Sequence, residues 1–208
     1  MERGNISIHT ENIFPIIKKW LYSDKDIFVR ELISNGCDAV HKLKRLTSLG
    51  EAKIEEDNAY KIVVKVNKDK KILSFSDNGI GMTAEEVEKY ITQVAFSGAE
   101  DFVKQYKESE DEGKQIIGHF GLGFYSAFMV SDKVQIDTLS YKEGAKAVKW
   151  ICDGGTEYEI GESKEQTSRG TTITLYINEE SSEFLDNYKV RSVIEKYCSF
   201  MPVEIFFE

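Results

Sequence analysis

The sequence is poor in the residues that mark disulfide frameworks, metal sites and long linkers. Its three cysteines, Cys37, Cys152 and Cys198, are odd in number and far apart. This predicts a reduced, cytosolic compartment without a disulfide framework or a zinc site. Three histidines are scattered along the chain, and only two prolines occur. There is no run of about 18 apolar residues, so no segment is expected to span a membrane.

Positive charge is also scarce, because 27 Lys and Arg stand against 36 Asp and Glu, for a formal net charge of −9. A nucleic-acid partner therefore has no electrostatic support over the whole chain. An acidic domain can still bind a phosphate anion through backbone N–H groups, a metal ion or a locally positive patch. The first nine residues are not expected to be a signal peptide. Because the last expected strand runs almost to residue 208, we expect a fragment of a longer protein.

Helical and strand patterns are grouped along the chain instead of alternating regularly. Such an order favours an α+β fold, in which a mostly antiparallel sheet carries helices on one face. Three segment starts resemble capping boxes, formed by Ser23 and Asp26, by Thr83 and Glu86, and by Ser97 and Glu100. The expected elements are helices at 11–22, 24–47, about 84–92 and about 188–198, a hairpin at 60–67 and 71–76, and later strands at 133–140, 145–152, 156–160, 171–178 and 203–207.

The helix at 24–47 carries a polar stripe. Glu31, Asn35 and Asp38 are spaced at i, i+4 and i+7, so they lie in a row beside the apolar face. One interpretation is the edge of a solvated face, because charged rows on helices are common. The other is a chemical site, since Asn and Asp are poor residues in the middle of a helix. An Asn oxygen suffices for Mg²⁺, which takes its other ligands from phosphates and water.

Arg30, Ser34 and His41 are expected on the water-facing side of this helix. Arg169, which precedes a glycine far along the chain, is expected to be a surface charge.

Two glycine-containing segments follow. "DNGIGMT" at 77–83 comes directly after a predicted strand, and its alternatives are an ordinary turn or a carboxylate placed beside a flat ring. "IIGHFGLGFYSAFMV" at 116–130 places three glycines among aromatic residues. Backbone N–H groups of a glycine turn before a helix, beginning here at about residue 122, form an anion site. "GLGFYS" lacks the third glycine of a dinucleotide fingerprint, and no G-x-x-x-x-G-K-[ST] motif exists.

Four segments together resemble a known family. "ELISNGCDA" (31–39), "DNGIGMT" (77–83), "GHFGLGFYS" (118–126) and "RGTTITLYI" (169–177) are similar to the N-terminal nucleotide domain of the ninety-kilodalton heat-shock chaperones of the bacterial HtpG type. The wider superfamily includes DNA gyrase, MutL and sensor histidine kinases. The resemblance covers essentially the whole chain, and it implies a two-layer ATP-binding sandwich of the Bergerat type over residues 1–208.

The resemblance also implies a role for each matching residue. Glu31 would be the general base that activates water, and Asn35 would bind the Mg²⁺ that bridges the phosphates of ATP or ADP. Asp77 would accept a hydrogen bond from the adenine amine, with Thr171 supporting it through water. Residues of about 93–122 would form a lid over ATP. The remaining expected site residues are Asp38 at the polar end, Gly79, Met82 and Phe124 in the pocket wall, and Gly118, Gly121 and Gly123 around the lid and phosphates.

The chain departs from the family pattern at the predicted lid, where "ITQVAFSG" places Phe96 at a position that is commonly lysine. Gly36 and Cys37 replace a more usual alanine and serine. In the family, a following middle domain supplies an arginine to the γ-phosphate, and further domains bind clients and form a homodimer. These domains are absent here, so slow or undetectable turnover is expected for this chain alone.

The leading hypothesis is therefore the ATPase domain of a cytoplasmic chaperone that acts on unfolded or partly folded client proteins, with no nucleic-acid or membrane partner. Two alternatives stay open. The first is the ATPase head of a DNA-repair or topoisomerase protein, which the acidic charge disfavours. The second is a nucleotide sensor that does not hydrolyse ATP, which the presence of Glu31 disfavours.

Overall fold

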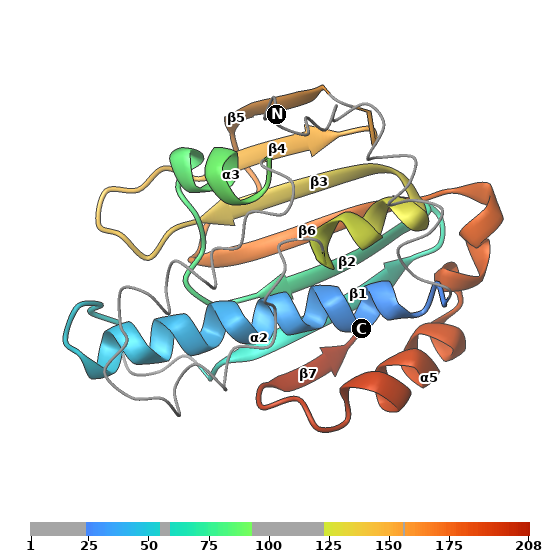
Figure 1. The fold of residues 1–208 in the computed structure, drawn as a ribbon, viewed down its shortest axis with the longest axis horizontal. Helices are drawn as coiled ribbons and strands as arrows, with labels where there is room; N and C mark the ends of the chain where they lie inside the picture. The colour runs from blue at the N-terminus through green and yellow to red at the C-terminus, as the bar shows by residue number, and fades with distance from the viewer. Residues whose placement is uncertain (1–23, 55–58, 93–122, 156) are drawn as a thin grey trace, which may run out of the picture.

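Seven strands form one sheet in the order β5-β4-β3-β6-β2-β1-β7 (Figure 1). The computed structural model describes residues 24–54, 59–92, 123–155 and 157–208. All neighbouring strands pair antiparallel except β1 and β7, which are parallel. The predicted mostly antiparallel α+β fold is thus confirmed. The strands are β1 (Lys61–Asn67), β2 (Ile72–Asp77), β3 (Ser131–Leu139), β4 (Val148–Cys152), β5 (Tyr158–Glu162), β6 (Gly170–Ile177) and β7 (Glu204–Phe207).

A long helix, α2, crosses the sheet in front of β1 and β2 (Figure 1). The short helix η2 lies beside it and follows directly on the glycine-rich segment. Near the end of the chain, α5 also contacts α2. The helices are α2 (Ile27–Ser48), α3 (Ala84–Tyr90), η2 (Gly123–Met129), η3 (Glu179–Leu185) and α5 (Asn187–Cys198).

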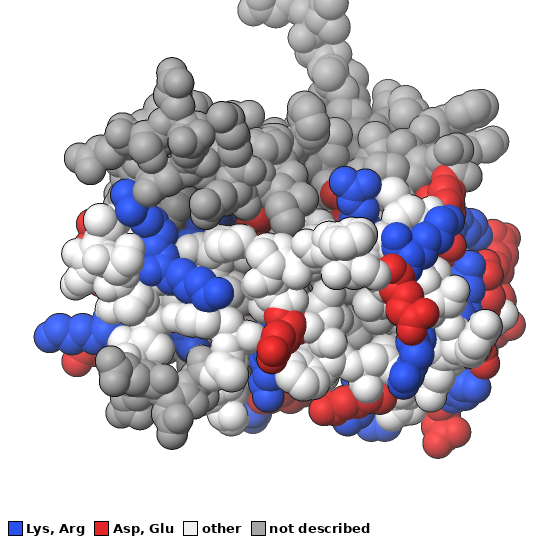
Figure 2. Space-filling model, turned by 90° about the horizontal axis from the view of Figure 1, so that it is seen from below, with Lys and Arg blue, Asp and Glu red and all other residues white. Residues whose placement is uncertain are grey.

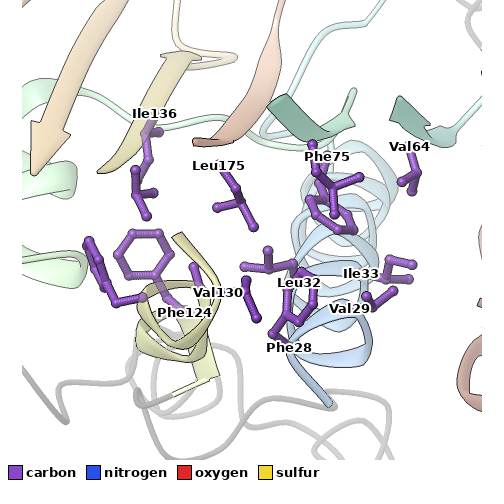
Figure 3. Packing of buried hydrophobic residues seen from close by; sticks show 14 of the residues in the cluster. Phe28, Val29, Leu32, Ile33, Val64, Phe75, Phe124, Val130, Ile136 and Leu175 are labelled. Atoms are coloured by element: carbon purple, nitrogen blue, oxygen red, sulfur yellow. The ribbon is translucent and has the colours of Figure 1, made fainter. Parts of the chain in front are cut away.

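The hydrophobic core lies between the sheet and these helices (Figure 3). Side chains alternate between the two faces of a strand, so every second residue meets the helices. Phe75 of β2 contacts Phe28 of α2 edge-to-face, with 6.2 Å between ring centroids. The opposite face of the sheet carries polar side chains instead. The strand residues that are buried in the core include Ile62, Val64, Leu73, Phe75, Val134, Ile136, Leu175 and Ile177.

Helix starts follow the sequence in one case and depart from it in another. At α3 the predicted capping box is confirmed: Thr83 Oγ1 accepts from the Glu86 N–H, and Glu86 Oε2 accepts from the Thr83 N–H. The expected helix at 11–22, Ser23 and the third predicted capping box lie outside the described residues. Asp26 occupies the N-cap of α2 but makes no side-chain capping bond. Its Oδ1 instead lies 2.7 Å from Nζ of Lys189 in α5, so tertiary packing replaces the predicted local bond.

One prediction for the polar side of α2 is wrong. Arg30 is exposed as expected and His41 is half-buried, but Ser34 is buried. The reason is that η2 and α5 contact α2 in addition to β1 and β2. A helix that packs only on a sheet has one side covered, whereas α2 is also covered on the sides that face η2 and α5.

Surface charge gives no sign of an extended basic patch on the face drawn in Figure 2. Acidic and basic side chains of the described residues are interspersed there around a broad uncharged area. A search of the described helices for one with the length and hydropathy of a membrane span finds none.

Candidate functional site

Helix α2 approaches the end of β2 unusually closely at Gly36. A Cβ atom added to Gly36 would lie 3.4 Å from Cβ of Asp77 and 3.1 Å from Cδ1 of Ile62. These are close contacts with side-chain atoms, so Gly36 of α2 and Asp77 at the end of β2 are neighbours.

The turn after β2 is fixed by glycines that pack against other backbone. A Cβ on Gly79 would lie 2.7 Å from Cβ of Ala39, and one on Gly81 would lie 1.9 Å from the carbonyl oxygen of Leu139. Gly81 also has a φ of +63°, a conformation that glycine adopts without steric cost. The Ile80 N–H donates to the Ala39 carbonyl at 3.1 Å, which ties the turn to α2. "DNGIGMT" is thus a turn whose conformation is fixed by packing against α2 and β3, and not an interchangeable surface turn.

Buried threonines connect this turn to the neighbouring strands. Thr171 of β6 pairs with Asp77 across the sheet, and its Oγ1 lies 2.9 Å from Oγ1 of Thr138. Thr138 in turn accepts a hydrogen bond of 3.0 Å from the Met82 N–H and donates to the Gly170 carbonyl. Sequence reasoning singled out Thr171 and Met82 but missed Thr138. No motif marks Thr138, because its role depends on which strands become neighbours.

Asp77 has an electrostatic environment that suits recognition. Its Oδ1 accepts a hydrogen bond of 2.8 Å from the Gly79 N–H. Burial raises the pKa of the carboxyl to about 7, although bonds from the Gly79 and Thr171 backbones and the charge of Arg169 lower it. A carboxylate in this position has acceptor capacity left for a donor on a ligand.

Glu31 lies near the N-terminal end of α2, where its side chain contacts Gly123, the first residue of η2. A Cβ on Gly123 would come within 2.5 Å of Oε2 of Glu31, so the carboxylate lies directly against Gly123 and would have to shift for a larger residue. Burial raises the pKa of Glu31, opposed by the charge of Arg30. A carboxyl with a raised pKa is a better general base near neutral pH than an exposed one.

Asn35 and Asp38 complete the stripe, with Asn35 half-buried and Asp38 only 5% exposed. Among the described residues, no group of three or more His, Cys, Asp or Glu side chains is arranged to hold a metal ion. A metal caged by protein carboxylates is thus not supported there. A single Asn oxygen is a fitting donor for Mg²⁺ that takes its remaining ligands from phosphates and water.

Phe124 of η2 lies inside the core. It is 7% exposed and contacts Trp150 and Phe128 edge-to-face, with 5.8 Å and 6.1 Å between centroids. η2 is a 3-10 helix that begins at Gly123, and its buried aromatic residues anchor it in the core. Gly118, Gly121, Phe96 and the predicted lid at 93–122 lie outside the described residues.

Arg169 is a further residue that sequence reasoning placed wrongly. The side chain is half-buried, not a plain surface charge, and its Nη1 is covered and has no hydrogen-bond partner. The cause is the neighbouring Gly170, whose φ of +128° lets the chain pack onto the backbone of Asp77 and Asn78. A Cβ on Gly170 would lie 2.0 Å from the Asp77 carbonyl oxygen.

Taken with this geometry, comparison with known families places the chain in a class of ATP-hydrolysing domains. A family model described as "Histidine kinase-, DNA gyrase B-, and HSP90-like ATPase" matches residues 23–168, and the chain belongs to this family.

Curated relatives specify the branch. The chain is 55% identical over 207 residues to Chaperone protein htpG of Bacteroides fragilis, which covers 100% of this chain and 29% of the relative. It is 52% identical over 206 residues to Chaperone protein HtpG of Porphyromonas gingivalis, and this match covers 99% of this chain and 29% of the relative. It is 43% identical over 202 residues to the protein of the same name from Fusobacterium nucleatum, and this match covers 95% of this chain and 33% of the relative. It therefore spans about a third or less of these relatives.

Proposed function

We propose that these 208 residues are the ATP-binding and ATP-hydrolysing domain of a longer, cytoplasmic chaperone that assists folding of client proteins and works as a homodimer. The observation that carries the proposal is the convergence on α2 of two distant segments, Asp77 at Gly36 and Gly123 at Glu31. The names of the relatives support the chaperone branch. Client binding and dimerisation would belong to domains outside these residues.

Adenine recognition would occur at the end of β2. Asp77 accepts a hydrogen bond from the purine amine, and Thr171 and Thr138 hold the neighbouring backbone in place. Met82 is half-buried against the core and offers an apolar edge for a flat ring. A buried acceptor discriminates strongly, because a ligand without the donor leaves it unpaired.

The phosphates would lie toward the Glu31 part of α2 and the glycine segment. Glu31 orients and deprotonates the attacking water, while Asn35 contributes an oxygen to Mg²⁺. The metal, when bound, would neutralise charge on the phosphates. Backbone N–H groups beside Gly118, Gly121 and Gly123 would cradle phosphate oxygens, Asp38 would support the polar end, and residues of about 93–122 would close as a lid.

The alternatives are distinguishable by experiment. An ATPase head of a DNA-repair or topoisomerase protein would show turnover stimulated by DNA, which the acidic charge and the HtpG relatives disfavour. A nucleotide sensor would bind ATP without turnover, and the position of Glu31 against Gly123 argues for hydrolysis. We therefore expect neither nucleic acid nor membrane as a partner.

Replacing Asp77 by asparagine tests the proposal most directly. Asparagine has no negative charge, and one of the two carboxylate oxygens becomes an N–H₂ donor. This donor cannot accept the hydrogen bond from the purine amine. We expect ADP affinity in the presence of Mg²⁺ to fall at least about tenfold, equivalent to about 1.4 kcal/mol, in isothermal titration calorimetry. Asp69→Asn, in the exposed turn between β1 and β2, is the matched control and should bind as the parent does. Unchanged affinity for Asp77→Asn would mean that the purine is held elsewhere.

Proton uptake by Asp77 gives a second test. The ligand requires the ionised carboxylate, and burial raises the pKa of Asp77 to about 7, so affinity should be full above that pH and lost as the pH falls through it. We expect ADP to bind about tenfold more weakly at about pH 6 than at about pH 8. Asp77→Asn cannot titrate and serves as the baseline for protonation of ADP itself. A parent protein whose profile parallels this baseline would exclude the role of Asp77.

A further inference from the structure

A small polar hollow of about 230 Å³ lies on the face of the sheet that points away from the helices. Ser76 and Thr172 line it, and their hydroxyl oxygens are 3.0 Å apart. Both alternate with core-facing neighbours on their strands, which places the hollow behind the nucleotide site. Its other lining residues include Lys61, Asp77, Asn78, Glu165, Gln166 and Arg169.

Arg169 is the unusual member of this hollow. Its Nη1 is buried without a hydrogen-bond partner, although leaving such a group unpaired costs about 1–3 kcal/mol. Burial lowers its pKa, while Tyr60 and Asp77 raise it, and a guanidinium in a protein remains charged at neutral pH. No contact ion pair joins Arg169 to an acidic side chain within the described residues. A half-buried cation with no contact ion pair within the described residues needs an explanation beyond packing.

The backbone places this cation next to Asp77. Gly170 packs onto the Asp77 carbonyl, so the preceding residue is held beside the end of β2. Asp77 lines the same hollow as Arg169, while its Cβ lies 3.4 Å from the hypothetical Cβ of Gly36 of α2. The charge of Arg169 lowers the pKa of the Asp77 carboxyl without a contact ion pair within the described residues, and the carboxylate, whose Oδ1 accepts from the Gly79 N–H, keeps acceptor capacity for a ligand.

We propose that Arg169 is a positioning residue for nucleotide recognition: its charge, held beside the end of β2 in the hollow that Asp77 also lines, keeps the Asp77 carboxyl ionised and able to accept a hydrogen bond from the purine amine. This rests on the proposed function. A contact ion pair would occupy the oxygens that the purine needs, whereas a nearby cation that makes no contact ion pair leaves them accessible. Burial of Asp77 raises its pKa, and the charge of Arg169 lowers that pKa again.

The other groups around Asp77 do not supply this charge. Burial, together with the nearby charges of Asp38 and Asp77, raises the pKa of the Cys37 thiol in α2 to about 12. The thiol is therefore neutral and supplies no charge. Asp38 on the same helix is acidic, which would oppose ionisation of a neighbouring carboxyl. Ile62 and Thr171, the strand partners of Asp77, carry no charge. Lys61 lines the same hollow but is exposed to solvent, where its field is screened.

The test is the pH dependence of ADP affinity in Arg169→Gln. Without the cation, Asp77 should take up its proton at higher pH. The loss of affinity relative to the parent should then be about threefold larger at about pH 6.5 than at about pH 8.5. Arg169→Lys keeps the charge and should restore most of the parent profile. Lys61→Gln removes a charge from the same hollow and should leave the profile unchanged. Circular dichroism melts verify that each variant is folded.

The Asp77→Asn background separates an electrostatic role from a structural one. There Arg169→Gln should add no loss that depends on pH, because the titrating group is gone. Equal loss at both pH values in the Asp77 background, or Arg169→Lys behaving as Arg169→Gln, would overturn the inference. If the parent protein fails to bind ADP at all, the proposed function is wrong instead. The two failures are therefore distinguishable.

Discussion

Replacing Glu31 by glutamine is expected to lower ATP turnover of the longer protein by about 10²–10⁴-fold while leaving ADP binding nearly unchanged. Glutamine keeps the shape of the side chain and removes its basicity. The carboxyl lies where a hypothetical Gly123 side chain would be, beside the glycine segment, and burial raises its pKa. A base in this position would act on water and not on the purine, so the loss should appear in turnover and not in affinity.

Steady-state phosphate release and calorimetry with ADP measure the two quantities separately. Glu195→Gln on the exposed side of α5 removes the same charge far from the site and should behave as the parent. The longer protein is the right material, because slow or undetectable turnover is expected of these 208 residues alone. Turnover that survives in Glu31→Gln would remove Glu31 from its role. Loss of ADP binding in the same variant would show a structural role instead.

Replacing Gly81 by alanine is expected to destabilise the domain by about 3 kcal/mol or more. Two effects add at this position. A residue with a side chain at a φ of +63° is strained by about 1–2 kcal/mol. The added Cβ would also lie 1.9 Å from the Leu139 carbonyl oxygen, and overpacking against rigid backbone costs typically about 1–3 kcal/mol. The turn would have to move away from β3, and Met82 would move with it.

Gly144→Ala separates the two effects. Gly144 has a φ of +74°, close to that of Gly81, but no atom lies within 4 Å of its hypothetical Cβ. This variant should therefore lose only the conformational part, about 1–2 kcal/mol. Chemical denaturation followed by circular dichroism gives both free energies of unfolding. Equal losses in the two variants would show that the turn can shift away from Leu139 without cost.

Several features of the fold were predictable because they depend on residues close in sequence. The Thr83–Glu86 capping box forms within one helical turn, so its sequence pattern is sufficient. The apolar runs at 60–67 and 71–76, on either side of a polar turn, predicted the hairpin that β1 and β2 form. The spacing of Glu31, Asn35 and Asp38 likewise placed them on one side of α2. Each is a consequence of backbone period or local hydrogen bonding.

The site itself could be assembled from the sequence only through family resemblance. Nothing in the spacing of residues says that Gly36 will meet Asp77, or that Gly123 will meet Glu31. Thr138 carries no motif, yet it joins the turn at Met82 to β6. Such contacts join segments far apart in the chain, and they exist only once the strand order and the crossing of α2 are set.

The sequence by itself determined the local elements, the polar stripe and the glycine positions of the proposed nucleotide site. Only the tertiary structure decided the burial of Ser34 and Arg169, which the sequence assigned to the surface, and the parallel pairing of β7 with β1. The physical reason is that backbone period and capping act over a few residues. The burial of a side chain, the field at a carboxyl and the partner of an edge strand depend instead on which distant segments pack there.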